Sequence, residues 1–479
     1  MSTGPTPLDS QTLEQLRKLL GPGGYLDEPA DLEPFLTDHR KLYHGVSPLV
    51  ALPATTTQVA AVVELCAARS VGIVPHGGNT SYCGGATPRE SGAEIVLSLR
   101  RMKHIREIDP LNNSVTVEAG CVLADLRRAA ESVDRLFPMS LGSEGSCTIG
   151  GNLSTNAGGT AVLRYGMMRD LALGLEVVLP DGRVLDQLQA LRKDNTGYDL
   201  KQLFIGAEGT LGIITAACLK LFPRPRGYAT ALIAIPSPQA AVDLLATLRG
   251  TLGDSVTTFE LMPRSALQLV CRHIEGATDP FDEPYDWYVL AEASLPQPDS
   301  DLAERLQSVL AAGMEHGALL DVLIATSLAQ REAFWKLRES IPESQTREGA
   351  SLKHDISVPT QDLPAFIVEG ARALEKIIPG GQLVAYGHLG DGNLHFNLGC
   401  PEGMDATTLL GRATEARRAI HELVAAHHGS FSAEHGIGRQ KVAELERYED
   451  PVALALMHQL KDLLDPAGIM NPGKVLARK

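Results

Sequence analysis

The sequence predicts an α+β fold, and three observations lead to this prediction. Helical and strand-like patterns alternate in the N-terminal part of the chain, which indicates an α/β domain there. Around residues 224–237 this pattern changes, and separate runs of helices and strands follow. The closing segment carries one amphipathic helix over residues 452–464. We therefore expect three parts, at residues 1–223, 224–430 and 431–479.

The individual helices and strands follow from hydrophobic spacing and from capping residues. In the helix expected over residues 55–69, apolar residues between Val59 and Cys66 recur at helical spacing after threonines that can cap the helix. Further helices are expected at residues 11–20, 123–132, 238–251, 301–317 and 361–376. Strands are expected at residues 71–75, 95–99, 115–118, 288–293, 320–325 and 383–388.

The composition excludes several classes of function. The formal net charge is −15, whereas a nucleic-acid surface needs a basic face. The 7 cysteines are scattered without a CxxC pair, so we expect neither a disulfide framework nor an iron–sulfur or structural zinc site. No long apolar stretch predicts a membrane span, and the N-terminus lacks a signal-peptide pattern. These features predict a cytoplasmic enzyme.

Three glycine-rich segments are candidates for cofactor binding, at residues 75–85, 142–159 and 207–215. Glycine lets backbone N–H groups approach a phosphate closely, and neighbouring serine, threonine and asparagine side chains add donors. None of the segments contains a GxGxxG or GxxxxGK[ST] pattern. One such segment alone indicates an ordinary turn, but three in order favour a dinucleotide that is bound in a non-Rossmann manner.

A histidine pair flanks a hairpin signal at Asp391-Gly392. A two-residue turn there would place His388 directly opposite His395, Leu389 opposite Leu394 and Gly390 opposite Asn393. Asn397 would share the face of His395 because side chains alternate along a strand. Two structural histidines are the alternative interpretation of this pattern.

A second segment, Ser432 to Gly438, adds a carboxylate at Glu434 and a third imidazole at His435. Two histidines and one carboxylate form a divalent metal site that leaves coordination positions open for a substrate. The remaining histidines of this region, His421, His427 and His428, are expected at the surface.

The glycine segments resemble the FAD-binding domain of the vanillyl-alcohol oxidase flavoprotein superfamily. Residues 194–206, DNTGYDLKQLFIG, and the closing Asn471-Pro-Gly-Lys474 resemble its D-lactate, glycolate and D-2-hydroxyglutarate dehydrogenase branch. The resemblance covers roughly residues 40–476. It implies a two-subdomain FAD-binding domain of the PCMH type, an α+β cap with an antiparallel sheet, and a C-terminal segment that returns to the flavin.

The resemblance also implies the FAD contacts, and FAD bound non-covalently. The alternative, covalent attachment, has a candidate in His76, because some superfamily members use a histidine. The implied contacts are Pro75, Gly77, Gly78, Asn79 and Thr80 in the first segment, Gly145, Thr148, Gly151, Asn152 and Thr155 in the second, Glu208, Gly209, Gly212 and Ile213 in the third, where the family holds the adenosine half, and Asn471 in the closing segment.

For the reacting end, the resemblance implies that His388, His395 and Glu434 bind a divalent metal and that His435 is the catalytic base. Zinc is the expected ion, with Mn²⁺, Co²⁺ or Fe²⁺ as alternatives. Asn397 is expected to orient the C1 carboxylate of the substrate.

The distal carboxylate of the substrate is expected to bind Arg338 and Lys353, with Lys353 and Asp355 on one face of a strand over residues 352–359. One departure from D-2-hydroxyglutarate enzymes of the branch is Pro342, where these can carry a hydroxyl residue. Ser340 and Ser344 are the residues that could compensate.

The implied activity is oxidation of a D-2-hydroxy acid, best D-2-hydroxyglutarate, by hydride transfer to flavin N5. Electrons would then pass to an electron-transfer flavoprotein or a quinone, and a homodimer is compatible with this activity. The alternatives are a D-lactate dehydrogenase, the FAD subunit of a glycolate oxidase complex, a non-heme iron oxygenase and a non-catalytic flavin-binding protein.

Overall fold

The computed structural model describes residues 8–298 and 300–477, and the chain divides into two compact units. The first unit combines Met1–Gly158, Gly166–Arg224 and Glu434–Lys479, and the second combines Gly159–Tyr165 and Pro225–Ala433. The division at Arg224 lies one residue from the boundary expected from the sequence. The closing segment folds with the first unit.

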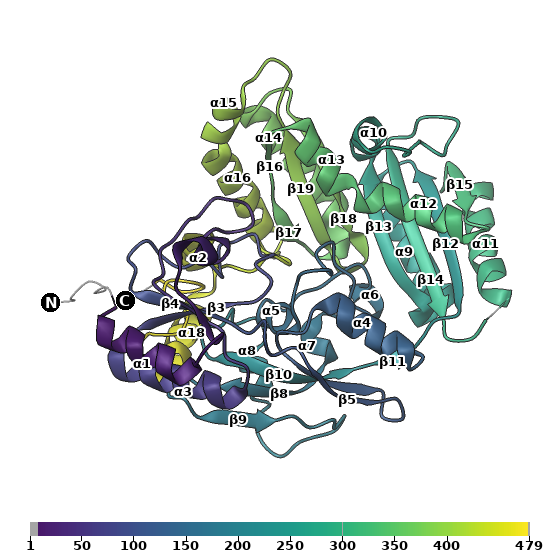
Figure 1. Cartoon of the computed structure of the whole chain (residues 1–479). Helices are drawn as coiled ribbons and strands as arrows, with labels where there is room; N and C mark the ends of the chain where they lie inside the picture. Colours follow the sequence, from purple (N-terminus) through teal and green to yellow (C-terminus); the bar gives the residue numbers. More distant parts are fainter. Residues whose placement is uncertain (1–7, 299, 478–479) are drawn as a thin grey trace. The chain divides into compact units, whose positions relative to one another are not determined.

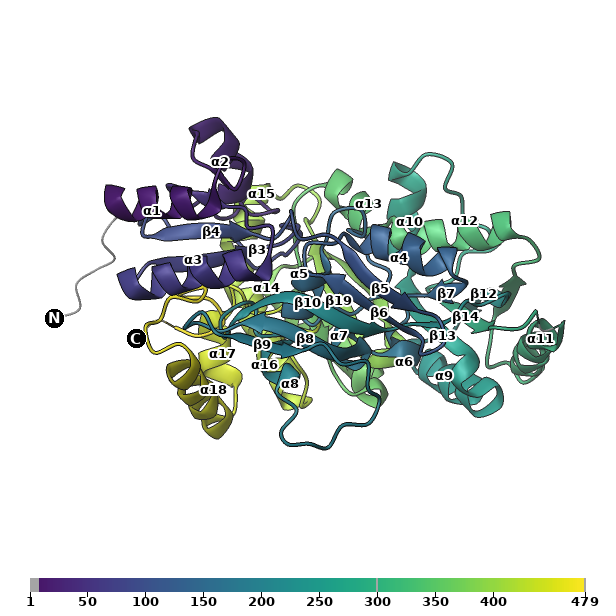
Figure 2. The same cartoon turned by 60° about the horizontal axis from the view of Figure 1, so that its bottom comes forward.

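A four-stranded sheet lies in the N-terminal part of the first unit (Figures 1 and 2). Its order is β1 (Tyr25–Leu26), β2 (Val50–Ala51), β4 (Glu94–Ser98) and β3 (Gly72–His76), and β2, β4 and β3 run parallel. Helices α1 (Ser10–Leu20) and α3 (Thr56–Arg69) share a hydrophobic core with these strands. Helix α3 begins as expected, because the Thr55 side chain accepts a hydrogen bond from the N–H of Gln58.

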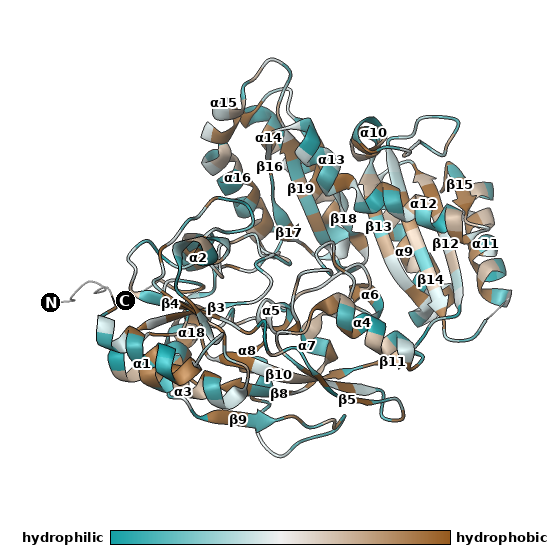
Figure 3. Ribbon diagram, in the orientation of Figure 1, coloured by the Kyte–Doolittle hydropathy of each residue, from teal (hydrophilic) through white to brown (hydrophobic). Residues whose placement is uncertain are grey.

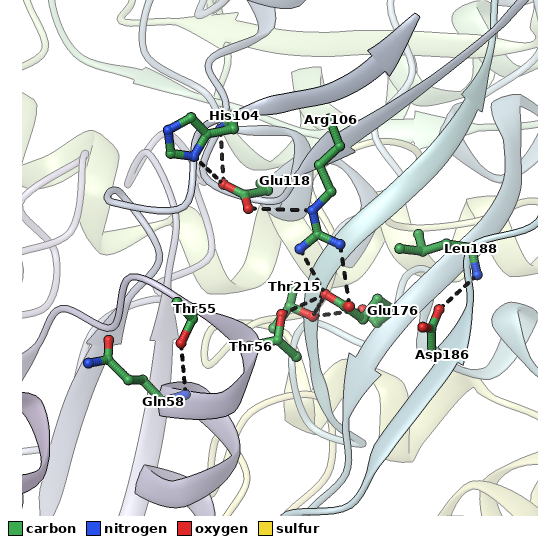
Figure 4. Close-up of polar contacts among 10 residues, drawn as sticks. All are labelled: Thr55, Thr56, Gln58, His104, Arg106, Glu118, Glu176, Asp186, Leu188 and Thr215. Carbon is green, nitrogen blue, oxygen red and sulfur yellow. Dashed lines mark hydrogen bonds and ion pairs between the residues drawn. The ribbon is translucent and has the colours of Figure 1, made fainter. Parts of the chain in front are cut away.

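The second sheet of the first unit is antiparallel, with five strands in the order β5 (Ile105–Asp109), β6 (Ser114–Glu118), β10 (Ile213–Lys220), β8 (Ala172–Val178) and β9 (Val184–Gln187). The carboxylate of Glu176 ties α3 to this sheet (Figure 4). It accepts hydrogen bonds from Thr56 Oγ1 at 2.6 Å, Thr215 Oγ1 at 2.8 Å and Arg106 at 3.2 Å. Burial alone would raise the pKa of Glu176, but these bonds lower it, so the carboxylate stays charged.

The C-terminal residues extend the first sheet along β3. Ile73 donates its N–H to the carbonyl of Ile469 at 2.7 Å and accepts from the N–H of Asn471 at 2.8 Å. The other elements of this unit are α2 (Pro29–Leu36), α4 (Leu123–Ser132), the paired β7 (Arg135–Leu136) and β11 (Phe222–Pro223), α5 (Ile149–Ser154), α7 (Met168–Leu171), α8 (Lys201–Phe204), α17 (Val442–Tyr448) and α18 (Pro451–Leu464).

The second unit contains one large antiparallel sheet. Its order is β15 (Asp321–Ile324), β12 (Gly227–Ile235), β14 (Trp287–Leu295), β13 (Val256–Pro263), β18 (Gln382–His388), β19 (Asn393–Gly399) and β16 (Ser351–Leu352), and β17 (Asp355–Ser357) also pairs with β19. The helices are α6 (Val162–Tyr165), α9 (Pro238–Leu252), α10 (Arg264–His273), α11 (Ser300–Glu315), α12 (Leu328–Glu339), α13 (Ile341–Glu348), α14 (Leu363–Ile377), α15 (Ala406–Gly411) and α16 (Ala413–Ala426).

Both faces of this sheet are covered, which explains why its strands are apolar along most of their length (Figure 3). On β12, Ile233 belongs to the core beneath α9, α11, α14 and α16, whereas Leu232 belongs to a second core with residues of α10, α12 and α13. The sheet is thus fixed from two sides. No helix among the described residues combines the length and the apolar character that a membrane crossing needs.

Two expectations of local structure were wrong. The strand expected over 352–359 is interrupted between β16 and β17, because the side chain of Asn397, rather than a backbone carbonyl, accepts the N–H of His354. Lys353 at this break is exposed, whereas Asp355 is buried. His421, expected at the surface, is only 4% exposed, because α16 turns it towards Phe431 at a ring distance of 5.3 Å.

Candidate active site

The hairpin that carries the two histidines has a different register from the expected one. Its turn is the 3-10 segment Leu389–Asp391, and Tyr386 rather than His388 lies opposite His395. His388 instead pairs with Glu260 of the neighbouring strand β13. The register shift is two residues, and an even shift leaves every side chain on its original face. The imidazoles of His388 and His395 therefore still converge, with ring centroids 5.8 Å apart.

A carboxylate joins these two rings. The ligand atoms of His388, His395 and Glu434 all lie within 4.8 Å of one another. Glu434 directly follows Ala433, whose backbone N–H lies 3.4 Å from the carbonyl oxygen of Asp355 on β17, so the chain itself holds this carboxylate near the hairpin. Two imidazoles and one carboxylate are a donor set that fits a divalent ion of the zinc or iron type.

A second cluster, of two carboxylates and one imidazole, includes His435, the base expected from the sequence. Asp355, Glu434 and His435 also bring one donor atom each within 4.8 Å of the others. The Asp355 carboxylate lies 3.9 Å from Nδ1 of His395 and accepts a hydrogen bond from Asn393 at 3.0 Å. Two carboxylates thus lie beside the imidazoles of His395 and His435.

Glu260 is a site residue that the sequence analysis missed. Its carboxylate is 1% exposed and lies 2.6 Å from Nδ1 of His388, while Nε of Arg338 donates to its other oxygen at 2.7 Å. Burial alone would raise the pKa of Glu260, but Arg338 and His388 lower it to about 2. A carboxylate that holds Nδ1–H leaves Nε2 of the imidazole for a metal. A single charged residue within the apolar strand β13 is the sequence signal that could have revealed it.

Replacing Glu260 with glutamine removes the negative charge beside Nδ1 of His388, so a divalent ion at the group of His388, His395 and Glu434 should bind about 10–100-fold more weakly. The dissociation constant for Zn²⁺, measured by competition with a chromophoric chelator, checks this value. Glu292→Gln is the matched control, because Glu292 is a buried carboxylate of the same sheet that binds Arg331 and Trp335. Equal losses in both variants would contradict the role of Glu260.

Two of the residues expected to contact the substrate, Arg338 and Asn397, already form hydrogen bonds with other residues of the protein. Arg338 is 5% exposed and bound to Glu260, and Asn397 donates to the Gln345 side chain at 3.0 Å while accepting the His354 N–H. The side chain of Lys353 is exposed. Both polar groups of the Asn397 side chain thus have partners within the protein, which accounts for its burial even when no substrate is bound.

The first two glycine segments pack against each other in the first unit. A Cβ at Gly77 would lie 2.7 Å from Thr148 Oγ1, and one at Gly78 would collide with the carbonyl oxygen of Ser146. Thr148 also caps α5, its hydroxyl accepting from the N–H of Gly151. In contrast, Gly145 faces open space. The two segments therefore form a backbone-lined cradle of the kind that binds phosphate groups.

Other implied contacts lie around this cradle. Asn79 has a φ of +53° and donates to the carbonyl of Thr37 at 2.8 Å. Asn152 is buried beside Cys147, and Thr155 donates to the Gly151 carbonyl at 3.0 Å. These contacts hold the loop and helix backbone in place, so their part is to shape the cradle.

Buried polar atoms without partners lie close to the same segments. Neither ring nitrogen of His76, at the end of β3, has a hydrogen-bond partner among the described residues, and burial lowers the pKa of this imidazole to about 4. Oδ1 of Asn471 likewise lacks a partner there, while its Nδ2 donates to the carbonyls of Gly85 and Glu208. These unpaired atoms are compatible with a polar ligand such as FAD.

The third glycine segment has a role that the sequence did not predict. Gly209 allows close packing on Pro75, and Gly212 allows close packing on Val177. Ile213 begins β10 and is 2% exposed in the core. The carboxylate of Glu208 accepts the N–H groups of residues 437 and 438. The side chains of this segment thus connect parts of the protein, and its contact with the adenosine half stays a prediction.

Known proteins resemble the chain in both sequence and fold. A family model described as FAD binding domain matches residues 47–187, and one described as FAD linked oxidases, C-terminal domain, matches residues 224–475. The mitochondrial D-2-hydroxyglutarate dehydrogenase of Arabidopsis thaliana is 37% identical over 98% of this chain and 82% of its own. The enzyme of the same name from Rattus norvegicus is 40% identical over 95% of this chain and 83% of its own.

Among solved structures, p-cresol methylhydroxylase with substrate bound matches with a TM-score of 0.76 at 17% identity, covering 98% of both chains. Fold and site thus define an FAD-linked oxidoreductase with a two-subdomain FAD-binding domain and an α+β cap. The chain belongs to the FAD-linked oxidases and, within them, to the FAD-dependent D-2-hydroxy acid dehydrogenases.

Proposed function

We propose that the protein oxidises D-2-hydroxyglutarate to the 2-oxo acid with the help of a divalent metal. The group of His388, His395 and Glu434, with His435 next in the chain, carries the proposal. The names of the relatives from Arabidopsis and rat support the choice of substrate. A non-heme iron oxygenase accounts for the ligand trio but not for the FAD-binding domain.

His388, His395 and Glu434 would hold the cation, with zinc as the first choice. A cation bound there would supply Lewis acidity to the hydroxy acid. FAD, held non-covalently, would supply the hydride acceptor. His435 accepts the proton of the C2 hydroxyl, a task that suits imidazole because it titrates near neutral pH.

The distal carboxylate of the substrate would bind Lys353, and Arg338 would support it. Pro342 lies in the first turn of α13 and offers no hydroxyl. Ser344 does not compensate, because its buried hydroxyl donates to the carbonyl of Ile341 at 2.9 Å. We therefore assign discrimination between substrate tails chiefly to Lys353, whose side chain is exposed, with Arg338 in support.

An anaerobic screen of flavin reduction tests the proposed function. The purified, metal-loaded protein is mixed with D-2-hydroxyglutarate, D-malate, D-lactate and glycolate, and the loss of oxidised-flavin absorbance is followed. We expect D-2-hydroxyglutarate to reduce the flavin with the highest kcat/KM. Fastest reduction by D-lactate or glycolate would point to the alternative dehydrogenases of the branch, and no reduction by any acid would favour a non-catalytic flavoprotein.

Replacing Lys353 with alanine is expected to lower kcat/KM for D-2-hydroxyglutarate by about 10-fold or more, because an ion pair to a carboxylate is removed. D-lactate has no distal carboxylate and should react nearly as before. Steady-state kinetics on both acids checks this, with Lys376→Ala on α14 as the control. Equal losses on both acids would rule out recognition of the distal carboxylate by Lys353.

The partners and location are proposed on the same basis. We propose an electron-transfer flavoprotein or a quinone as acceptor, and a homodimer as the assembly. The cytoplasmic location expected from the sequence also stays a prediction, and the relatives named above are mitochondrial.

A further inference from the structure

We propose that Glu208 is the positioning residue for His435 and acts by fixing the backbone of residues 436–438. The inference rests on the proposed function, since it assumes that His435 takes the substrate proton. It connects two motifs that lie more than 200 residues apart, namely the third glycine segment and the segment that carries the base.

The contact is a two-point hydrogen bond. Oε1 of Glu208 accepts the N–H of Ile437 at 2.7 Å, and Oε2 accepts the N–H of Gly438 at 2.9 Å. Two successive peptide groups are thereby held by one carboxylate, which fixes both their distance and their orientation. Glu208 is 8% exposed, so water competes little for these bonds.

The backbone on both sides of this contact is built for close approach. Gly436 has a φ of +72°, and a Cβ there would lie 2.7 Å from Oε1 of Glu208. A Cβ at Gly438, with a φ of +53°, would collide with the carbonyl oxygen of Cys83. That carbonyl also accepts the N–H of Arg439 at 2.8 Å. The glycines of this segment are therefore explained by its packing between Glu208 and Cys83.

Fixing this segment fixes the imidazole, because His435 directly precedes Gly436. The ring of Tyr82 also contacts the His435 ring edge to face, with centroids 4.7 Å apart. Burial raises the pKa of Glu208 to about 7, although the two amides and Lys441 act in the opposite direction. A carboxyl group that is kept in the interior against this cost is typical of a functional position.

Glu208→Gln tests the proposal in the FAD-loaded protein. Glutamine has the same shape but presents an NH₂ group to one of the two N–H donors, so one bond must break. We expect amide hydrogen exchange in peptides over residues 434–441 to accelerate about 10-fold or more. We also expect the rate constant of flavin reduction by D-2-hydroxyglutarate to fall about 100-fold with little change in KM, because the base is displaced while the substrate still binds.

Two further variants keep the test decisive. Glu176→Gln is the matched control, since Glu176 is equally buried in the same unit but binds α3 and strand residues instead; it should leave exchange over 434–441 and the reduction rate unchanged. Glu208→Asp keeps the charge but shortens the reach, and should give an intermediate rate. If the glutamine variant does not fold, the aspartate variant carries the measurement.

The outcomes separate this inference from the proposed function. Unchanged exchange over 434–441 in Glu208→Gln would overturn the inference. If that variant also lost its flavin, Glu208 would act on the cofactor instead. If exchange rises in Glu208→Gln while no hydroxy acid reduces even the unaltered protein, the contact with the segment is supported and the proposed reaction fails.

Discussion

Replacing His435 with alanine is expected to lower the rate constant of flavin reduction by about 10²–10⁴-fold, the usual contribution of a positioned general base. FAD should stay bound, because the cradle of Gly77, Gly78 and Thr148 does not involve this side chain. Metal should also stay bound, since the trio His388, His395 and Glu434 is complete without it. Anaerobic stopped-flow absorbance with D-2-hydroxyglutarate measures the rate directly.

His316→Ala, an exposed imidazole at the C-terminal end of α11, is the control for general effects of removing a histidine. It should reduce at the unaltered rate. Near-normal flavin reduction in His435→Ala would exclude this residue as the base. The carboxylate of Asp355, which belongs to the same group, would then be the next candidate for the base. Loss of flavin absorbance in the purified variant would instead mean that His435 supports cofactor binding.

The convergence of the two histidines could be predicted from the sequence even though the register could not. Side-chain alternation fixes the face of His388 and His395 as long as any shift is even. The turn itself depended on tertiary context, because His388 pairs with Glu260 on β13 and not with β19. Sequence patterns describe the hairpin alone and carry no information about the third strand.

The supporting contacts of the site could not be predicted for a related reason. Glu260 lies 128 residues from His388 in the chain, and Glu208 lies 229 residues from Ile437. Such pairs become neighbours only when sheets and loops pack. His421 shows the same limit, since helical periodicity did not reveal that Phe431, a residue beyond the end of α16, covers it. Motifs of chemically unusual residues were visible, whereas the residues that hold them in place were not.

Replacing His395 with alanine is expected to weaken Zn²⁺ binding by more than the roughly 10–100-fold expected for a supporting residue, because one of the three proposed ligands is lost. In this variant one imidazole fewer would hold the metal, while the carboxylates of Asp355 and Glu434 would remain in place. Bound metal stabilises the folded state by about 2.7 kcal/mol at 100 times its Kd. Added Zn²⁺ should therefore raise the Tm of the metal-free protein but have little effect on this variant.

His427→Ala is the matched control, since His427 also lies beside a carboxylate, 3.2 Å from Glu369, but outside the metal group. Its Zn²⁺-dependent Tm shift should equal that of the unaltered protein.

Chelation should abolish flavin reduction in the unaltered protein, and added Zn²⁺ should restore it, while His395→Ala should stay inactive at the same Zn²⁺ concentration. A full Tm shift in His395→Ala would mean that the cation binds elsewhere in the protein.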